Sequence, residues 1–146
     1  MNKFYAVIFL TFILIFTFAV SGLAAPDYIS AGSVGAGGWL TIVNPDKTYS
    51  TTYSSTYSVT GFAEDGATVY VYKSNGSGGY NRIHEYSQTV GASGCFVIPV
   101  KLSGGRNAFL FRSELGGSVK DGTFEINLLS SSMYNLVKNF NGGLFK

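Results

Sequence analysis

The segment Tyr57–Lys73 reads YSVTGFAEDGATVYVYK, and its pattern decides how the rest of the chain is interpreted. Apolar and polar residues alternate through both halves of the segment, which is typical of β-strands with one buried face. Between the halves, Gly66 ends a polar turn, because glycine adopts the positive φ that a tight reversal requires. The segment therefore predicts two consecutive strands, at residues 57–63 and 67–73.

The same alternation continues on both sides of this segment, with turn residues at intervals typical of a β-sandwich or barrel. The strand at 82–90 is more polar than the others, which favours an edge position. Five further strands are expected, at residues 39–43, 82–90, 96–102, 107–112 and 123–129. The apolar residues that alternation turns inward should form the core between two sheets: Val59, Val69, Val71, Phe96, Ile98, Phe109 and Phe111.

Two stretches resemble a known family. The first has a valine, glycine and alanine strand, a Gly-Ala turn and alternating valines, formed by Val59, Gly61, Ala63, Gly66, Ala67, Val69 and Val71. The second, GCFVIPVKLSGGRNAFLF at residues 94–111, has an aromatic strand, a glycine turn and a further alternating strand. Both are similar to bacterial immunoglobulin-like (Big-type) extracellular domains. The resemblance implies an all-β chain with a single immunoglobulin-like β-sandwich of about seven strands, used as a spacer, adhesion or binding module.

The first residues have the order of a secretory leader, with one lysine, an apolar run at residues 4–20 and small residues before Pro26. Cleavage after Ala24 places Gly22 and Ala24 at the two small positions, so residues 1–24 are interpreted as a signal peptide. The alternative is an uncleaved anchor helix, because the run exceeds the ~7–15 residues of a signal core and approaches the about 20 residues of a membrane span. Either reading predicts a secreted protein or one on the extracellular face of the cell envelope.

Three further regions follow the leader. Residues 25–38 are rich in glycine and are interpreted as a flexible linker to the sandwich at residues 39–129. Residues 130–146 form a tail with a short amphipathic helix, because serines that can cap a helix precede apolar residues at helical spacing. The apolar stripe of this helix is expected to dock on its own sandwich; its residues are Met133, Leu136, Val137 and Phe140.

Charge and reactive side chains exclude several functions. After residue 24 the chain carries nine Lys and Arg residues and eight Asp and Glu residues, scattered singly. No basic stripe is present, so nucleic acid is not an expected partner, and membrane contact is expected only through an uncleaved leader. The only histidine, His84, has no evident partners, and Cys95 is the only cysteine. We therefore expect no catalytic residues, metal site or cofactor, and we expect Cys95 to be a small buried residue.

Tyrosines provide the candidate binding residues. In TYSTTYSSTYS, residues 48–58, Tyr49, Tyr53 and Tyr57 recur every four positions and would share one face of an extended strand. Tyr70 and Tyr72 share a face of a later strand. Tyrosine rings and hydroxyls suit sugars and protein partners, although tyrosine is also simply common in strands. The expected function is a non-enzymatic interaction module for a cell-envelope glycan or surface protein; the alternative is a structural subunit of the envelope that self-associates through an edge strand.

Overall fold

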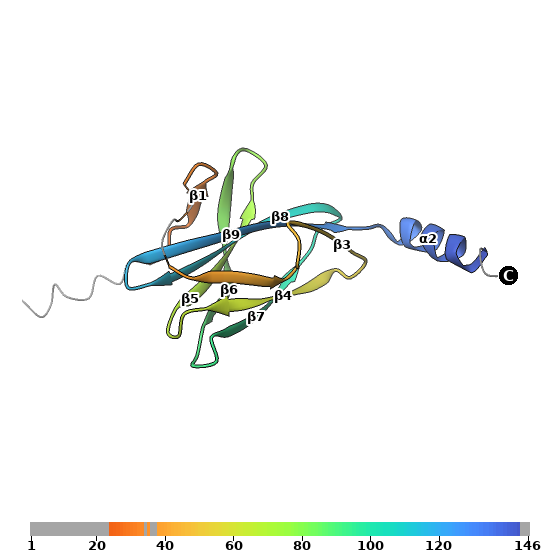
Figure 1. Ribbon diagram of the computed structural model, residues 1–146. Coiled ribbons are helices and arrows are strands. Elements are labelled where there is room, and N and C mark those ends of the chain that lie inside the picture. Colours follow the sequence, from red (N-terminus) through yellow and green to blue (C-terminus); the bar gives the residue numbers. More distant parts are fainter. Residues whose placement is uncertain (1–23, 34, 36–37, 144–146) are drawn as a thin grey trace, which may run out of the picture.

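The structure is a computed structural model that describes residues 24–33, 35 and 38–143 (Figure 1). It shows a mostly β chain with two packed sheets and a C-terminal helix. The elements are β1 (Tyr28–Ser30), β2 (Leu40–Asn44), β3 (Tyr49–Thr52), β4 (Thr56–Ala63), β5 (Thr68–Ser74), β6 (Gly79–Thr89), β7 (Cys95–Lys101), β8 (Gly105–Leu115), β9 (Ser118–Leu128) and α2 (Ser131–Gly143). Each of the seven predicted strands overlaps one of these strands, so the all-β sandwich is confirmed. The predicted signal or anchor helix lies outside the described residues.

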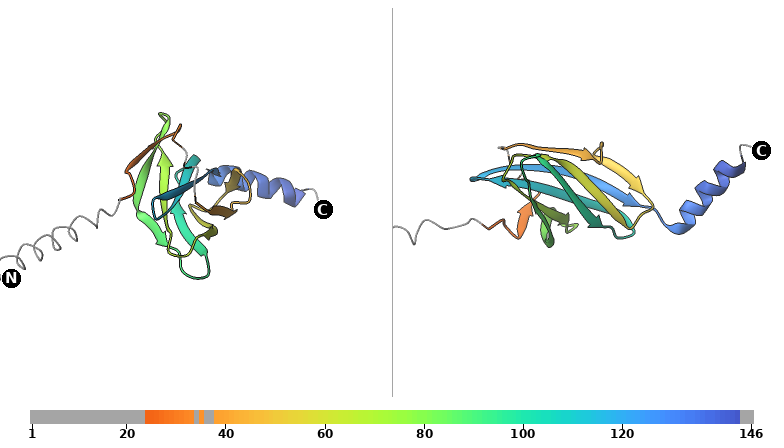
Figure 2. Two further views of the ribbon diagram at one scale, coloured as in Figure 1. Left: turned by 60° about the vertical axis from the view of Figure 1, so that its left-hand side comes forward. Right: turned by 90° about the horizontal axis from the view of Figure 1, so that it is seen from below.

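The two sheets form two layers (Figure 2). One has six strands in the order β1-β6-β5-β8-β9-β3, and the other has three in the order β2-β4-β7. All neighbours are antiparallel except β3 and β9, which are parallel. The two strands of the deciding segment, β4 and β5, lie in different sheets. The turn at Gly66, which has a φ of 80°, therefore carries the chain from one layer to the other.

The core fills the space between the layers. All seven residues expected to face inward are buried there, which confirms the predicted core. The ring of Phe111 contacts two other rings, with centroids 6.1 Å from Phe96 and 5.3 Å from Phe124. On β9, Gly122 leaves room for β2, because a Cβ at this position would lie 3.1 Å from the Cγ1 of Ile42.

The segment predicted as a flexible linker contains strand β1, which pairs with Gly79–Asn81 of β6. Ile29 of β1 is 3% exposed and packs with Tyr72 and Leu110 on the outer face of the six-stranded sheet. Beyond β1, the Ser33 carbonyl accepts a hydrogen bond from the Arg112 side chain, and the Gly35 amide donates one to the Asp121 side chain. Both side chains lie on this outer face. The described part of residues 25–38, called the N-terminal segment below, therefore packs against the sandwich.

The sheet edge at β7 is covered by side chains. Between Tyr70 and Tyr72 of β5 the pairing partner on β6 changes from Ser87 to Arg82, so β6 carries extra residues at this point. Two β6 side chains reach β7: Gln88 Oε1 accepts the Val97 amide at 3.0 Å, and the Tyr86 hydroxyl accepts the Lys101 amide at 3.3 Å. The Cys95 amide donates to Ser93 Oγ, and Pro99 has no amide hydrogen.

Helix α2 extends beyond the end of the sandwich (Figures 1 and 2). Its cap is as predicted, because the Met133 amide donates to Ser130 Oγ at 3.3 Å. Met133 and Leu136 are 48% and 61% exposed, so the expectation that the apolar stripe docks on its own sandwich is wrong for these residues. Where the helix begins, the ring of Tyr134 contacts the ring of Tyr53 of the sandwich.

Candidate functional site

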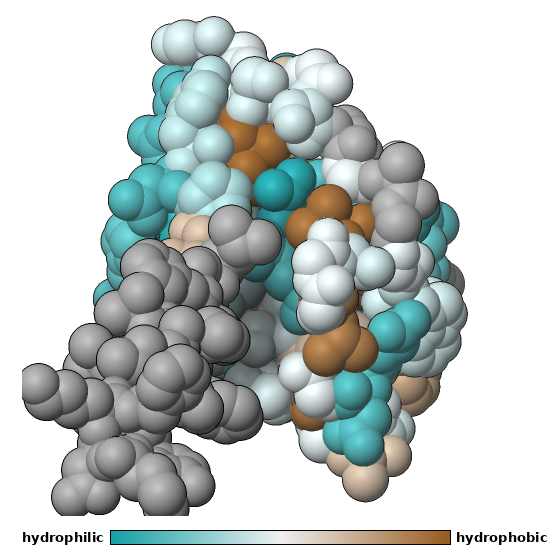
Figure 3. All heavy atoms as spheres, turned by 90° about the vertical axis from the view of Figure 1, so that its left-hand side faces the viewer, coloured by the Kyte–Doolittle hydropathy of each residue, from teal (hydrophilic) through white to brown (hydrophobic). Residues whose placement is uncertain are grey.

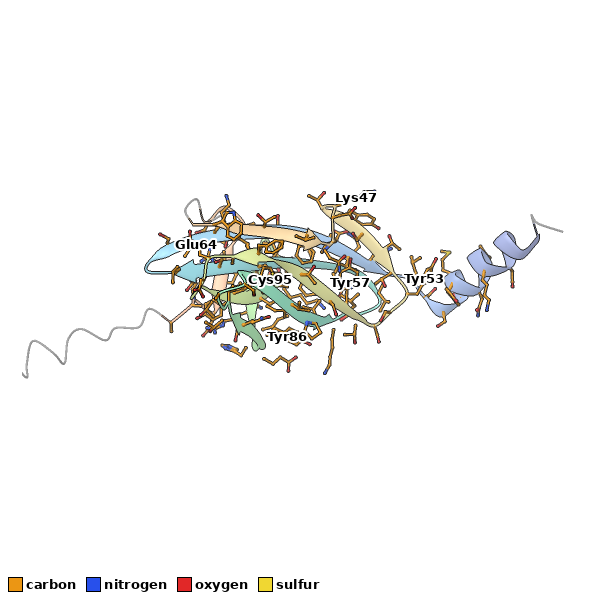
Figure 4. All side chains as sticks on the ribbon, turned by 60° about the horizontal axis from the view of Figure 1, so that its bottom comes forward. Lys47, Tyr53, Tyr57, Glu64, Tyr86 and Cys95 are labelled. Atoms are coloured by element: carbon orange, nitrogen blue, oxygen red, sulfur yellow. The ribbon has the colours of Figure 1, made fainter. Side chains whose placement is uncertain are left out.

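The predicted row of three tyrosines is divided between the two sheets. Tyr49 in β3 and Tyr53 just after it are 51% and 45% exposed. Tyr57 is the second residue of β4 in the other sheet, is half-buried against the core, and donates its hydroxyl to Asn44 Oδ1 at 2.7 Å. Figure 4 shows Tyr53 beside the start of α2 and Tyr57 on the body of the sandwich. Only Tyr49 and Tyr53 therefore offer their rings to a ligand.

Tyr70 and Tyr72 lie on the outer face of the six-stranded sheet, as alternation predicts, but the N-terminal segment changes their surroundings. Tyr72, predicted to bind a ligand, is fully buried and packs with Ile29, so its ring is not exposed on the surface. The Tyr70 ring is half-buried and stacks with the guanidinium of Arg82, 4.4 Å from the ring centroid. These two tyrosines do not form an open platform.

A tyrosine that was not predicted completes a site with Tyr53. The ring of Tyr134, in the first turn of α2, meets the ring of Tyr53 edge to face, with centroids 4.8 Å apart. Together with Ser54 and Ser131 these rings line an open pocket of about 440 Å³. We call these four residues the tyrosine cleft. Tyr134 was missed because it lies beside the apolar stripe of the helix and its partner comes from a distant strand.

The chemistry of the tyrosine cleft is aromatic and hydroxylic. No residue that lines it carries a formal charge. Tyrosine rings pack on the apolar faces of sugars and on apolar side chains, while hydroxyls donate and accept hydrogen bonds. The cleft therefore offers a ligand both apolar ring surface and hydroxyl groups for hydrogen bonds.

A buried ion pair lies on the face that the N-terminal segment covers. Arg112 donates from Nε and Nη2 to the two carboxylate oxygens of Asp121, each at 2.7 Å. The Asp121 side chain is fully buried and also accepts the Gly35 amide at 2.6 Å, while Arg112 Nη2 lies 3.4 Å from the Ser33 carbonyl. The hydrogen bonds to Asp121 raise the pKa of Arg112. The pair therefore fastens the N-terminal segment to the sheet.

Next to this ion pair, the buried hydroxyl of Tyr72 has no hydrogen-bond partner among the described residues. Burial, and then the nearby charge of Glu114, raises the pKa of Tyr72 to about 12. Burial also raises the pKa of Glu114, although Arg112 and Arg82 act in the opposite direction.

The outer face of the three-stranded sheet carries the cysteine. Cys95 is exposed at the start of β7, so the expectation of a buried residue is wrong. The reason is its place in the alternation: Phe96 points into the core, so its neighbour Cys95 points outward. Trp39 and Phe62 are also exposed on this side, with ring centroids 6.4 Å apart.

The remaining sequence candidates do not form a site. His84 is exposed, as expected, and its Nε2 lies 3.4 Å from Asp27 Oδ1. Within the described residues no three side chains of His, Cys, Asp or Glu are grouped to hold a metal ion. The described part of the chain also has no helix long and apolar enough to cross a membrane. Comparisons with known protein families, curated proteins and solved structures found no match.

Proposed function

We propose that this protein is an exported, non-enzymatic interaction module that binds a cell-envelope glycan or a surface protein through the tyrosine cleft. The observation that carries the proposal is the exposed edge-to-face pair of Tyr53 and Tyr134 beside an open, uncharged pocket. Tyr49, also exposed, extends the aromatic surface along β3. Aromatic anchors of this kind dominate the binding energy of many interfaces.

The proposed fold is an immunoglobulin-like sandwich of the bacterial extracellular type. The order β2-β4-β7 against β6-β5-β8-β9-β3 supports it, because it corresponds to strands A-B-E facing C′-C-F-G-A′. In this reading β1 is an addition at the outer edge of β6. The fold is used in many extracellular modules, so it fits a binding role without specifying the ligand.

The proposed export predicts a defined N-terminus. We expect the exported protein to begin at Ala25, because Gly22 and Ala24 supply the small side chains that a signal peptidase requires. Intact-mass spectrometry of the protein recovered from outside the cytoplasm checks this. A mass that includes Met1 would establish the uncleaved anchor instead.

The binding role is tested by Tyr53→Ala and Tyr134→Ala in pull-downs from cell-envelope fractions and on glycan arrays. Each change should weaken binding at least about 30-fold, the equivalent of a 2 kcal/mol interface anchor. Because both rings are more than two-fifths exposed, the free energy of unfolding should change by no more than about 1 kcal/mol.

The matched control is Tyr28→Ala, which removes an equally exposed ring at the other end of the sandwich. This variant should bind like the unaltered protein. Retention of every interaction by the Tyr53→Ala, Tyr134→Ala double variant would contradict the proposal. Capture on a glycan array identifies a sugar ligand, whereas capture that protease treatment of the envelope abolishes identifies a protein.

The alternative, self-association through an edge strand, loses one of its candidate edges. Strand addition requires free backbone amides. At β7 the outward amides of Cys95, Val97 and Lys101 already donate to side chains of the same molecule. These three amides are therefore not available for pairing with a second copy at this edge.

A further inference from the structure

Ala24 lines a cavity at the end of the molecule where the N-terminal segment meets the β8–β9 turn. The cavity has a volume of about 690 Å³, and its wall also includes Pro26, Tyr70, Arg112 and Glu114. Figure 3 shows this end, where hydrophilic and hydrophobic side chains surround a recessed surface. The cavity therefore adjoins the peptide bond at which the leader is proposed to be cleaved.

Residue 25 is held firmly at this position. Ala25 is 4% exposed, and its carbonyl accepts a hydrogen bond from Arg82 Nη1 at 3.0 Å. The Arg82 amide donates to the Asp27 carbonyl at 2.9 Å, and β1 follows immediately. Cleavage after Ala24 would release an α-ammonium group whose position is already fixed beside the cavity.

Glu114 is the carboxyl group in the cavity wall. Among the described residues it has no hydrogen bond or ion pair, whereas Arg112 is bound by Asp121. Arg82 stacks on Tyr70 and donates to Ala25. The charges of Arg112 and Arg82 thus lower the pKa of Glu114 without a hydrogen bond to it. Burial has the larger effect and raises this pKa.

We propose that this cavity is the binding site for an ammonium group, supplied by the α-amine of Ala25 after cleavage, with Glu114 as its hydrogen-bonding counter-ion. This inference rests on the proposed cleavage. A half-buried carboxylate without donors is stabilised by a cation that can donate to it directly, and an ammonium group has three N–H donors. A lysine side chain of a partner could supply the same chemistry, and the test separates the two sources.

The test measures the pKa of the α-amine in the exported protein. Its amines are reductively methylated with ¹³C-formaldehyde, and the Ala25 methyl signal is followed by NMR through a pH titration, folded and in denaturant. The folded pKa should exceed the denatured value, ordinarily about 7.7–8.0, by about one unit. In Glu114→Gln the difference should vanish, while in the control Glu125→Gln, whose carboxylate binds Arg106 on the same sheet, it should persist.

The other charged and titratable groups near Glu114 are Tyr72 of β5, Arg82 of β6, Arg112 of β8 and Asp121 of β9. The pKa of Arg112 is raised and that of Tyr72 is about 12, so neither group titrates near pH 8. A pKa raised by folding adds stability at pH values below the denatured-state pKa, and this stability is lost as pH rises through the folded-state value. The melting temperature should therefore fall above about pH 8 in the unaltered protein but not in Glu114→Gln.

Equal α-amine pKa values in the folded and denatured protein, or the same shift in Glu114→Gln, would overturn the proposal. If Glu114→Gln does not fold, a second test uses protein in which the Ala25 α-amine is acetylated. Because acetylation removes the ammonium charge, the pKa of Glu114 should then rise. Lysine amide added to the unaltered protein should leave the Glu114 carboxyl signal unchanged; a saturable shift would instead assign the cavity to a partner's amine. Mass spectrometry tests the cleavage separately, and a recombinant chain beginning at Ala25 tests the contact if the natural cleavage differs.

Discussion

Replacing Phe111 with alanine is expected to lower the free energy of unfolding by about 3–5 kcal/mol, the cost of opening a large cavity in a packed core. The Phe111 ring is fully buried between the sheets and contacts both Phe96 and Phe124. A domain of this size has a total stability of about 5–15 kcal/mol. The variant should therefore be partly unfolded or melt far below the unaltered protein, as measured by urea denaturation followed by circular dichroism.

Phe62→Ala is the control for this prediction. It removes the same side chain from a position that is 39% exposed on the outer face of the three-stranded sheet. The expected loss is no more than about 1.5 kcal/mol, because little cavity is left. Equal losses for the two variants would contradict the assignment of Phe111 to the core.

Asp121→Ala is expected to lower the free energy of unfolding by about 3–5 kcal/mol, because it leaves the buried guanidinium of Arg112 without its counter-ion. The side chain of Arg112 is 9% exposed and that of Asp121 is fully buried. The change also removes the acceptor of the Gly35 amide, so the N-terminal segment should be released from the sheet. Hydrogen exchange should show faster exchange at Ile29 as well as lower global stability.

The matched control is Glu125→Ala, which breaks the ion pair with Arg106 on the neighbouring part of the same two strands. The Arg106 side chain is 79% exposed, so solvent screens this pair and its loss should cost far less than the loss of the Arg112–Asp121 pair. A similar cost for both variants would show that burial does not decide the strength of the Arg112–Asp121 pair.

The strands with strong alternation could be predicted because the pattern of inward and outward side chains lies within each strand's own sequence. Residues 57–63 and 96–102 place a side chain inward at every second position, and the structure buries Val59, Phe96 and Ile98 accordingly. Strand β1 has no such signal, since Ile29 is its only apolar aliphatic residue and stands beside a glycine-rich stretch. Its burial depends on Tyr72 and Leu110, which lie far along the chain.

The sites were less accessible to sequence analysis because they depend on pairing between segments. Tyr53 was a candidate binding residue from the sequence, but its contact with Tyr134 depends on where α2 leaves the sandwich. The Arg112–Asp121 pair did have a usable signal. Counting outward from the Gly116-Gly117 turn places these two residues opposite each other in an antiparallel hairpin.

The β6 side chains that cover the β7 edge also bear on strand-to-strand aggregation. Amyloid-like cross-β stacking requires a row of unused amides on a flat strand, and Gln88 and Tyr86 occupy that row at β7. Tyr86 lies among the extra residues, between Arg82 and Ser87, whereas Gln88 pairs with Val69 in the regular part of the ladder. The occupied amides of Val97 and Lys101 should therefore hinder cross-β stacking at the β7 edge of the three-stranded sheet.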